Sequence, residues 1–195
     1  MICFWEDDAQ GLKAGKPILV LGGSSSVGQL GKPIIGPFRY RTMAYTYSLH
    51  PALQISKHLG YSTIITTSSL AHTDHLKSLG ATHVLDRSTP VNELVSSIRE
   101  ILGQVTMDVA WDAVGAITQE YIDLLAPGGG FILANPQALK PEFSFTDGRR
   151  PLIPNGGGHA FKEYAIALFE KLGGLLEAGV IKVCLIILIG WILGC

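Results

Sequence analysis

The chain has 195 residues, and its 15 lysine and arginine residues nearly balance 16 aspartate and glutamate residues, which leaves a net charge of -1 at pH 7. This balance offers no electrostatic basis for binding nucleic acid or an anionic membrane surface, so we expect neither as a partner. Only 16% of the residues are charged, whereas 47% are hydrophobic and 23 are glycine, which excludes a disordered chain. The length corresponds to one domain of ordinary size.

The cysteines and the two ends of the chain indicate the cellular compartment of the protein. Cys3, Cys184 and Cys195 have the spacing of neither a disulfide framework nor a metal site, so we expect a reducing compartment. The first ten residues carry three acidic side chains and lack the pattern of a signal peptide. The uncharged residues 183–195 (VCLIILIGWILGC) are fewer than the ~20 that span a bilayer. We therefore expect a cytoplasmic protein, with residues 183–195 as an apolar tail.

Apolar runs alternate with helical patterns from residue 17 onwards. The apolar runs predict five strands, at residues 17–22, 63–66, 83–86, 107–114 and 131–134. Amphipathic spacing and glycine stops predict helices at residues 73–79, 91–102, 117–125 and about 160–178. Thr89 is expected to cap the second of these helices, with Pro90 as its first residue. We expect a turn at residues 127–130 (PGGG) and a surface excursion at residues 136–158.

Strands and helices that alternate in this way build right-handed βαβ units. The predicted fold class is therefore α/β, a doubly wound parallel sheet with helices on both faces. Residues 31–51 break the pattern, because they carry three prolines where the first crossover helix is expected. Without them, residues 26–30 would continue into residues 52–59 as one helix that ends at Gly60.

We interpret residues 31–51 and 183–195 as translated introns. Gly31-Lys32 can be encoded by GGTAAG and Val183-Cys184 by GTATGT, and both contain sequences similar to eukaryotic splice donors. One cause would then explain both departures from the pattern.

A glycine-serine loop follows the first predicted strand, where a dinucleotide-binding fold places the pyrophosphate. Glycine permits a tight turn, and serine hydroxyls and free backbone N–H groups can bind phosphate oxygens at the positive end of a helix. An ordinary tight turn is the alternative. The loop residues predicted to bind the cofactor are Gly22, Gly23, Ser24, Ser25, Ser26, Val27 and Gly28.

The end of the second predicted strand indicates which cofactor binds. NAD-specific sites usually carry an acid there, whereas this chain has Ser68 and Ser69. Their hydroxyls can donate to a 2′-phosphate and Arg87 can add positive charge, so we predict NADP(H) rather than NAD. Alternatively Ser69 caps the following helix, and both roles can coexist.

Further candidate cofactor-binding residues lie at the end of the strand predicted at residues 107–114. Asp112, Val114 and Gly115 stand at the carboxyl edge of the sheet, where ligands bind in open α/β folds. We predict a contact with the nicotinamide ribose, and a strand-ending turn is the alternative. His72 and His75 share one helical face but have no apparent third ligand, so we assign no metal site.

Two other enzyme classes share this type of fold. Short-chain dehydrogenases need a Tyr-x-x-x-Lys pair, and no tyrosine here has lysine four residues later. Methyltransferases that use S-adenosylmethionine usually place an acid at the end of strand two, where this chain has serines, so they remain a distant alternative.

Six segments resemble, in order, the cofactor domain of the medium-chain dehydrogenase/reductase superfamily. They are AGKPILVLGGSSSVGQ, LQISKHLGYSTIITTSS, HLKSLGATHVLDR, MDVAWDAVG, LLAPGGGFILA and LLEAGVIK, and they span roughly residues 11–182 apart from 31–51. The resemblance is closest to zinc-independent enoyl reductases and quinone-oxidoreductase-like members, including the trans-acting enoyl reductases of fungi. It implies that NADPH is bound by Ser24, Ser25, Ser26, Val27, Ser68, Ser69, Asp112, Val114 and Gly115.

The resemblance also implies a domain division. Family members have an N-terminal catalytic domain that contains a GroES-like barrel, whereas only about ten residues precede the cofactor domain here. We therefore expect an N-terminal remnant (residues 1–16), a Rossmann NAD(P)-binding domain (17–182) with an insertion at about 31–51, and the apolar tail. No catalytic residue is assigned.

Two functions are compatible with these observations. The first is an NADPH-dependent oxidoreductase by ancestry, which transfers a hydride to an activated C=C or C=O bond of a small molecule. The second is a non-catalytic nucleotide-binding fragment or an inactive, truncated gene product. We expect the isolated chain to be inactive unless a homo-oligomer or a partner chain supplies the missing domain.

Overall fold

The computed structural model describes residues 14–24, 50–153 and 162–181. The chain forms two compact units, Met1–Pro154 and Asn155–Cys195, which are described separately. The first unit holds a β-sheet and its helices, and the second holds one long helix.

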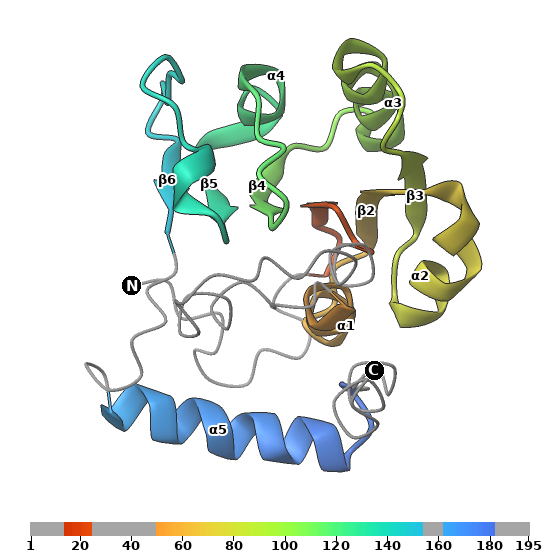
Figure 1. The fold of residues 1–195 in the computed structure, drawn as a ribbon, viewed down its shortest axis with the longest axis vertical. Coiled ribbons are helices and arrows are strands. Elements are labelled where there is room, and N and C mark those ends of the chain that lie inside the picture. The colour runs from red at the N-terminus through yellow and green to blue at the C-terminus, as the bar shows by residue number, and fades with distance from the viewer. Residues whose placement is uncertain (1–13, 25–49, 154–161, 182–195) are drawn as a thin grey trace, which may run out of the picture. The chain divides into compact units, whose positions relative to one another are not determined.

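A six-stranded parallel sheet forms the centre of the first unit (Figure 1). Its strands are β1 (Pro17–Leu21), β2 (Thr63–Ser68), β3 (His83–Asp86), β4 (Met107–Asp112), β5 (Leu125–Leu133) and β6 (Arg150–Leu152). Their order is β3-β2-β1-β4-β5-β6, so the chain builds outwards from β1 in one direction and then in the other. The predicted α/β fold class, a doubly wound parallel sheet, is confirmed.

Strand β1 lies between β2 and β4, and its composition suits that position. All five of its residues are buried, as expected for a strand covered on both faces. Ile18 and Val20 belong to one hydrophobic core, and Leu19 and Leu21 belong to the other. This division follows from the alternation of side chains along a strand.

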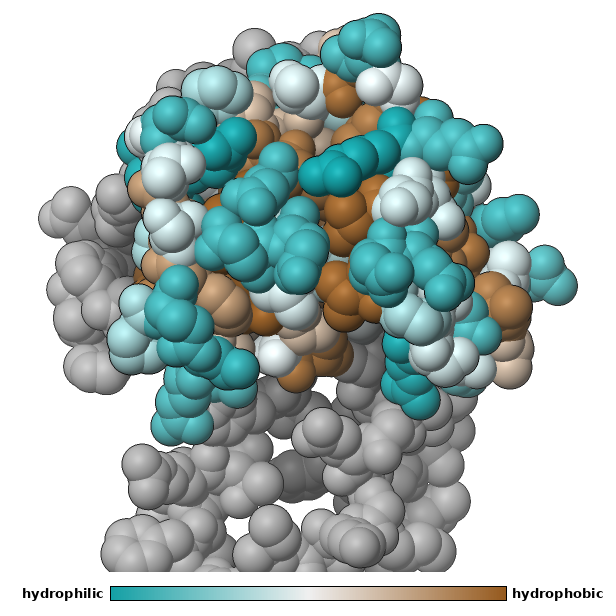
Figure 2. Space-filling model, turned by 90° about the horizontal axis from the view of Figure 1, so that it is seen from above, coloured by the Kyte–Doolittle hydropathy of each residue, from teal (hydrophilic) through white to brown (hydrophobic). Residues whose placement is uncertain are grey.

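Helices cover both faces of the sheet (Figure 1). They are α1 (His50–His58), α2 (Thr73–Leu79), α3 (Val91–Leu102) and α4 (Gln119–Ile122). Leu53 of α1 and Leu76 of α2 are fully buried in the core that contains Ile18. On the opposite face α3 and α4 bury Ile98 and Ile122, and the outer surface of this side is largely hydrophilic (Figure 2).

The predicted N-cap of one helix and the predicted length of another were wrong. Pro90, rather than Thr89, is the N-cap of α3, because its backbone is extended (φ -54°, ψ 144°) while its carbonyl accepts the N–H groups of Glu93 and Leu94. The helix predicted at residues 117–125 is only four residues long. Its N-cap, Thr118, is extended, and the chain enters β5 at Leu125.

The PGGG segment is not the predicted turn but lies within β5. A Cβ atom on Gly130 would lie 2.2 Å from Cδ1 of Leu152, so glycine lets β6 approach β5 closely. The register of β4 against β5 also shifts between Met107 and Val109, opposite this segment. Residues with little strand propensity therefore form a strand because of their packing.

The predicted surface excursion contains the sixth strand, which the sequence analysis missed. A tight turn precedes it, in which the Arg149 N–H donates to the Thr146 carbonyl at 3.0 Å. Asp147 in this turn has φ of 55°, the left-handed conformation that aspartate tolerates. The Asp147 carbonyl in turn accepts the Gly128 N–H at 2.8 Å, which joins the turn to β5.

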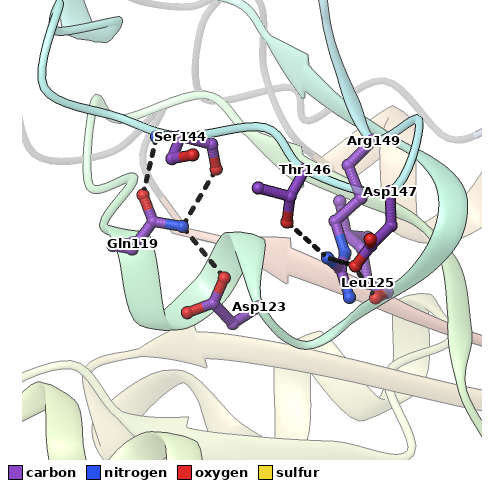
Figure 3. A network of polar contacts seen from close by, with 7 residues as sticks. All are labelled: Gln119, Asp123, Leu125, Ser144, Thr146, Asp147 and Arg149. Carbon is purple, nitrogen blue, oxygen red and sulfur yellow. Dashed lines mark hydrogen bonds and ion pairs between the residues drawn. The ribbon is translucent and has the colours of Figure 1, made fainter.

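Side chains also attach the excursion to β5 and to α4 (Figure 3). The Arg149 Nε donates to the Leu125 carbonyl at 2.9 Å, and one terminal nitrogen forms an ion pair with Asp147 at 3.0 Å. The Gln119 amide accepts the Ser144 N–H at 2.9 Å and donates to the Ser144 carbonyl at 3.0 Å. These bonds, together with the packing of Phe145 against the core, hold residues 144–149 in place.

The second unit contains α5 (Lys162–Glu177), close to the helix predicted at about 160–178. Nowhere in the described ranges does a helix have both the length and the apolar character needed to cross a membrane. Most of the predicted insertion and the apolar tail lie outside the described residues. Only the last two residues of 31–51 are described, and they form the start of α1, so the intron interpretation is untested.

Arg149→Ala should lower the free energy of unfolding by about 1–3 kcal/mol, because the Leu125 carbonyl and Asp147 lose a charged partner. Arg150→Ala is the matched control, since its side chain is exposed, and its effect should stay within about 0.5 kcal/mol. Urea unfolding of the full chain measures both values. Equal effects of the two variants would contradict the proposed role of Arg149.

Candidate functional site

A cavity of about 270 Å³ opens at the carboxyl ends of the strands. One part of its lining is polar or backbone: Gly22, Ser24, Thr67, Ser68, Arg87 and Thr89. The other part is mostly apolar: Leu21, Val91, Leu94, Val114, Ala116 and Tyr121. The ends of β1, β2, β3 and β4 therefore meet around one hollow, at the edge of the sheet where open α/β folds bind ligands.

The turn after β1 is held against the end of β2. The Gly22 N–H donates to the Thr67 hydroxyl at 3.0 Å, and the Gly23 N–H donates to the Thr67 carbonyl at 3.0 Å. Gly22 has φ of 82°, and a Cβ atom there would lie 2.4 Å from Cγ1 of Val114. The turn thus requires glycine both for its conformation and for its contact with the segment after β4.

The two serines predicted to bind phosphate at the end of β2 differ in environment. The Ser68 side chain is fully buried, and its hydroxyl lies 2.6 Å from that of Ser24, with which it shares a hydrogen bond. This bond joins the turn after β1 to the end of β2. Ser69 does not line the cavity, and its side chain makes no capping hydrogen bond to the following helix.

Arg87 brings positive charge to the cavity. Its backbone N–H donates to the Ser68 carbonyl at 2.9 Å, which places it directly after the pairing of β2 with β3. Its side chain is exposed, and in the described part of the chain its guanidinium forms no hydrogen bond or ion pair. Neighbouring Asp86 accepts the Ser88 N–H, which together with the charge of Arg87 lowers the pKa of its carboxyl.

The sequence left two roles open for Asp112, a contact with the nicotinamide ribose or a turn that ends the strand. Its hydrogen bonds have the geometry of such a turn. One carboxylate oxygen accepts the N–H groups of Val114 and Gly115, both at 2.9 Å, and the other accepts the Ile117 N–H at 2.7 Å. The side chain is 1% exposed. Asp112 therefore ends β4 two residues before the predicted boundary and positions Val114 beside Gly22.

Tyr121 lines the cavity from α4 and was not among the predicted site residues. It is 3% exposed, and burial raises the pKa of its hydroxyl, with smaller contributions from the charges of Asp112 and Glu120. The hydroxyl therefore stays protonated at neutral pH. A tyrosine at an apolar helix position predicts a core residue, so the sequence carried no signal for this location.

The structure brings many of the predicted site residues together. Gly22, Ser24, Ser68, Arg87 and Val114 line the cavity, while Gly23 and Asp112 support it through backbone hydrogen bonds. Ser69 and Gly115 do not line it. The remaining predictions, Ser25, Ser26, Val27 and Gly28, lie outside the described residues. The unpredicted Thr67 and Thr89 also belong to the lining.

Comparison with known proteins agrees with this arrangement. A family model described as "Zinc-binding dehydrogenase" matches residues 50–148, just over half of the chain. A 2-methylene-furan-3-one reductase of Solanum lycopersicum is 27% identical over 173 residues, which are 88% of this chain and 33% of that protein. The chain thus spans about a third of that relative's length.

Solved structures share the fold. A putative zinc-binding dehydrogenase from Sinorhizobium meliloti 1021, bound to NADP, has a TM-score of 0.58 at 20% identity, over 90% of this chain and 45% of that one. A mycobacterial quinone oxidoreductase has a TM-score of 0.55 at 22% identity, over 91% of this chain and 50% of that one.

The description of the matching family includes zinc. Within residues 14–24, 50–153 and 162–181, no group of three or more His, Cys, Asp or Glu side chains is placed to hold a metal ion. The described residues therefore do not fit a zinc site, and no step proposed below involves the metal.

Gly22→Ala should destabilise the chain more than Gly15→Ala. Both glycines have similar positive φ, 82° and 79°, but a Cβ atom on Gly15 would meet nothing within 4 Å. The difference should be about 1–3 kcal/mol in the free energy of unfolding, measured with urea. Adding Val114→Ala to Gly22→Ala should recover much of that difference. An equal loss at both glycines would show that the contact with Val114 contributes nothing.

Proposed function

Because the chain belongs to the zinc-binding dehydrogenase family, within the medium-chain dehydrogenase/reductase superfamily, we propose that it binds NADP(H) in the cavity at the strand ends. The observation that carries this proposal is that the turn at Gly22–Ser24 and the cation of Arg87 line the same cavity. A phosphorylated dinucleotide needs both a close backbone approach and positive charge. The residues present fit that requirement.

The preference for NADP(H) over NAD(H) rests on Arg87. No carboxylate stands at the end of β2, where NAD-specific sites carry an acid for the ribose hydroxyls. Arg87 is instead available to pair with a 2′-phosphate, and the Ser24–Ser68 hydroxyl pair lies in the same lining. The relative from Sinorhizobium meliloti, described as bound to NADP, agrees with this preference.

We further propose that the chain belongs to an oxidoreductase that acts on an activated C=C or C=O bond of a small molecule. The nicotinamide, when bound, supplies the hydride. The turn after β1 and the cavity walls bind and orient the cofactor, and Asp112 acts indirectly by holding Val114 in place. The names of a furanone reductase and a quinone oxidoreductase among the similar proteins support this substrate class.

A nucleotide-binding module without activity of its own is the second candidate. It is favoured because every described residue with an assigned role lines or supports the cavity proposed for the cofactor. All residues assigned above bind or position the cofactor, and none is assigned to the substrate.

Arg87→Ala should weaken NADPH binding about tenfold or more and change NADH binding by less than about twofold, because a charge-assisted hydrogen bond contributes about 1.5–3 kcal/mol. Arg99→Ala, which removes a cation of α3 that does not line the cavity, is the matched control. Calorimetric titration of the full chain measures all affinities. If wild-type chain binds NADPH and NADH equally, the proposed contact with the 2′-phosphate is wrong.

A second variant tests the end of β2. Ser69→Asp should reverse the preference, because a carboxylate beside the 2′-phosphate would repel it and could instead accept the ribose hydroxyls of NADH. An unchanged preference would contradict a role of Ser69 in binding the 2′-phosphate.

Turnover separates the two candidate functions. We expect the purified chain with NADPH to reduce enones, quinones and aldehydes no faster than a protein-free control, since positioning of the substrate supplies much of an enzyme's rate. The loss of NADPH absorbance measures this. Robust reduction by the chain alone would reject the module and establish the oxidoreductase, and reduction only at high protein concentration would point to a second copy that completes the pocket.

A further inference from the structure

One segment of the cavity wall carries a motif that the proposed function does not use. Thr89-Pro90 is the one place in the 195 residues where a serine or threonine directly precedes a proline. Proline-directed protein kinases phosphorylate the hydroxyl of this dipeptide, and a phosphate changes the charge around its residue. Thr89 also lines the cavity, so a change of charge there would act on the cavity itself.

The dipeptide lies in the turn between β3 and α3. The Thr89 N–H donates to the Asp86 carbonyl at 3.1 Å, and the Ser88 N–H donates to the Asp86 carboxylate at 3.0 Å. The residues on both sides of Thr89 are exposed, namely Arg87, Ser88 and Pro90. Thr89 itself is half-buried. The acceptor hydroxyl therefore lies in a surface turn that a kinase can approach from solvent.

A phosphate on Thr89 would find two favourable partners close by. Arg87 precedes Thr89 by two residues, lines the same cavity, and forms no ion pair with any side chain that the structure describes. Helix α3 begins directly after Pro90, whose side chain makes no capping hydrogen bond. A phosphothreonine carries a charge of about -1.5 to -2 at pH 7 and three acceptor oxygens. A guanidinium and the positive start of a helix both stabilise such a group.

We propose that Thr89 is a phosphorylation site for a proline-directed protein kinase and that its phosphate pairs with Arg87. The pair would neutralise the cation of the cavity and add negative charge to the lining. The consequence for the cofactor rests on the proposed function, because a chain modified in this way should bind NADP(H) more weakly. Phosphorylation would then switch cofactor binding off.

The transfer takes its phosphoryl group from ATP. The Thr89 hydroxyl oxygen forms a bond to the γ-phosphorus, and the bond between that phosphorus and the β–γ bridging oxygen breaks. ADP leaves, and the hydroxyl proton passes to the catalytic base of the kinase. Hydrolysis by a phosphatase reverses the modification and releases inorganic phosphate.

The site is tested by incubating the full chain with ATP, Mg²⁺ and a purified mitogen-activated protein kinase, which is proline-directed. Peptide mass spectrometry should locate a phosphate at Thr89 of the wild-type chain. Pro90→Ala should lower the phosphorylation about tenfold or more, although it keeps the hydroxyl. Ser88→Ala is the matched control and should change it by less than about twofold. No phosphate at Thr89, or equal phosphorylation of Pro90→Ala, would overturn the proposal.

The pairing with Arg87 is tested without any cofactor. A nearby cation favours the doubly charged phosphate, so the second pKa of phosphothreonine should lie below its usual value of about 6. Phosphorus NMR of the phosphorylated chain should show this pKa rise by about 0.5 in Arg87→Ala and stay unchanged in Arg99→Ala, which removes an exposed cation of α3 outside the cavity lining. Equal values in the wild-type chain and Arg87→Ala would show that no pair forms.

Cofactor affinity separates this proposal from the proposed function. Calorimetric titration should show about tenfold or more weaker binding of NADPH to the phosphorylated chain, and phosphatase treatment should restore the original affinity. If the unmodified chain binds NADPH and the phosphorylated chain binds it equally well, the switch is wrong and the proposed function stands. If the unmodified chain does not bind NADPH, the proposed function fails, and the switch fails with it. The mass spectrometry and the NMR titration then still decide whether Thr89 is the site.

Discussion

The carboxylate of Asp112 determines how the edge of the sheet is arranged. Buried at the end of β4, it accepts three backbone N–H groups and ends the strand. Because the turn is fixed, Val114 packs where only a glycine at position 22 leaves room. The cavity lies between the turn after β1, the turn after β4 and the ends of β2 and β3. A buried acid in such a position acts on a ligand through the backbone that it holds.

The cavity combines two kinds of wall that come from different parts of the chain. The turn after β1 and the end of β3 contribute glycine backbone and a cation, while α3 and α4 contribute apolar side chains and one phenol. The parallel topology brings them together, because the carboxyl ends of all the strands meet at one edge. Cofactor binding of the kind proposed needs both walls, since a dinucleotide has charged and aromatic parts.

The sequence predicted α2, β3 and α3 with the boundaries that the structure has, because strong hydrophobic periodicity agrees there with glycine punctuation. It failed at the PGGG segment and at β6, where the conformation depends on distant contacts such as that of Arg149 with Leu125. The residues predicted from the sequence that line the cavity include Ser68, which ends β2, and Gly22, which directly follows β1. Tyr121 was missed because a tyrosine at an apolar helix position predicts a core residue.

The central position of β1 has a consequence during synthesis. Leu19 pairs with Ala110, so β1 leaves the ribosome well before β4, and both of its edges are covered only after β4 has emerged. Pairing over such sequence distances slows folding. Meanwhile PILVL, with no charged residue, is exposed in the nascent chain and is prone to aggregate. Early shielding of this segment therefore protects the nascent chain until β4 pairs with it.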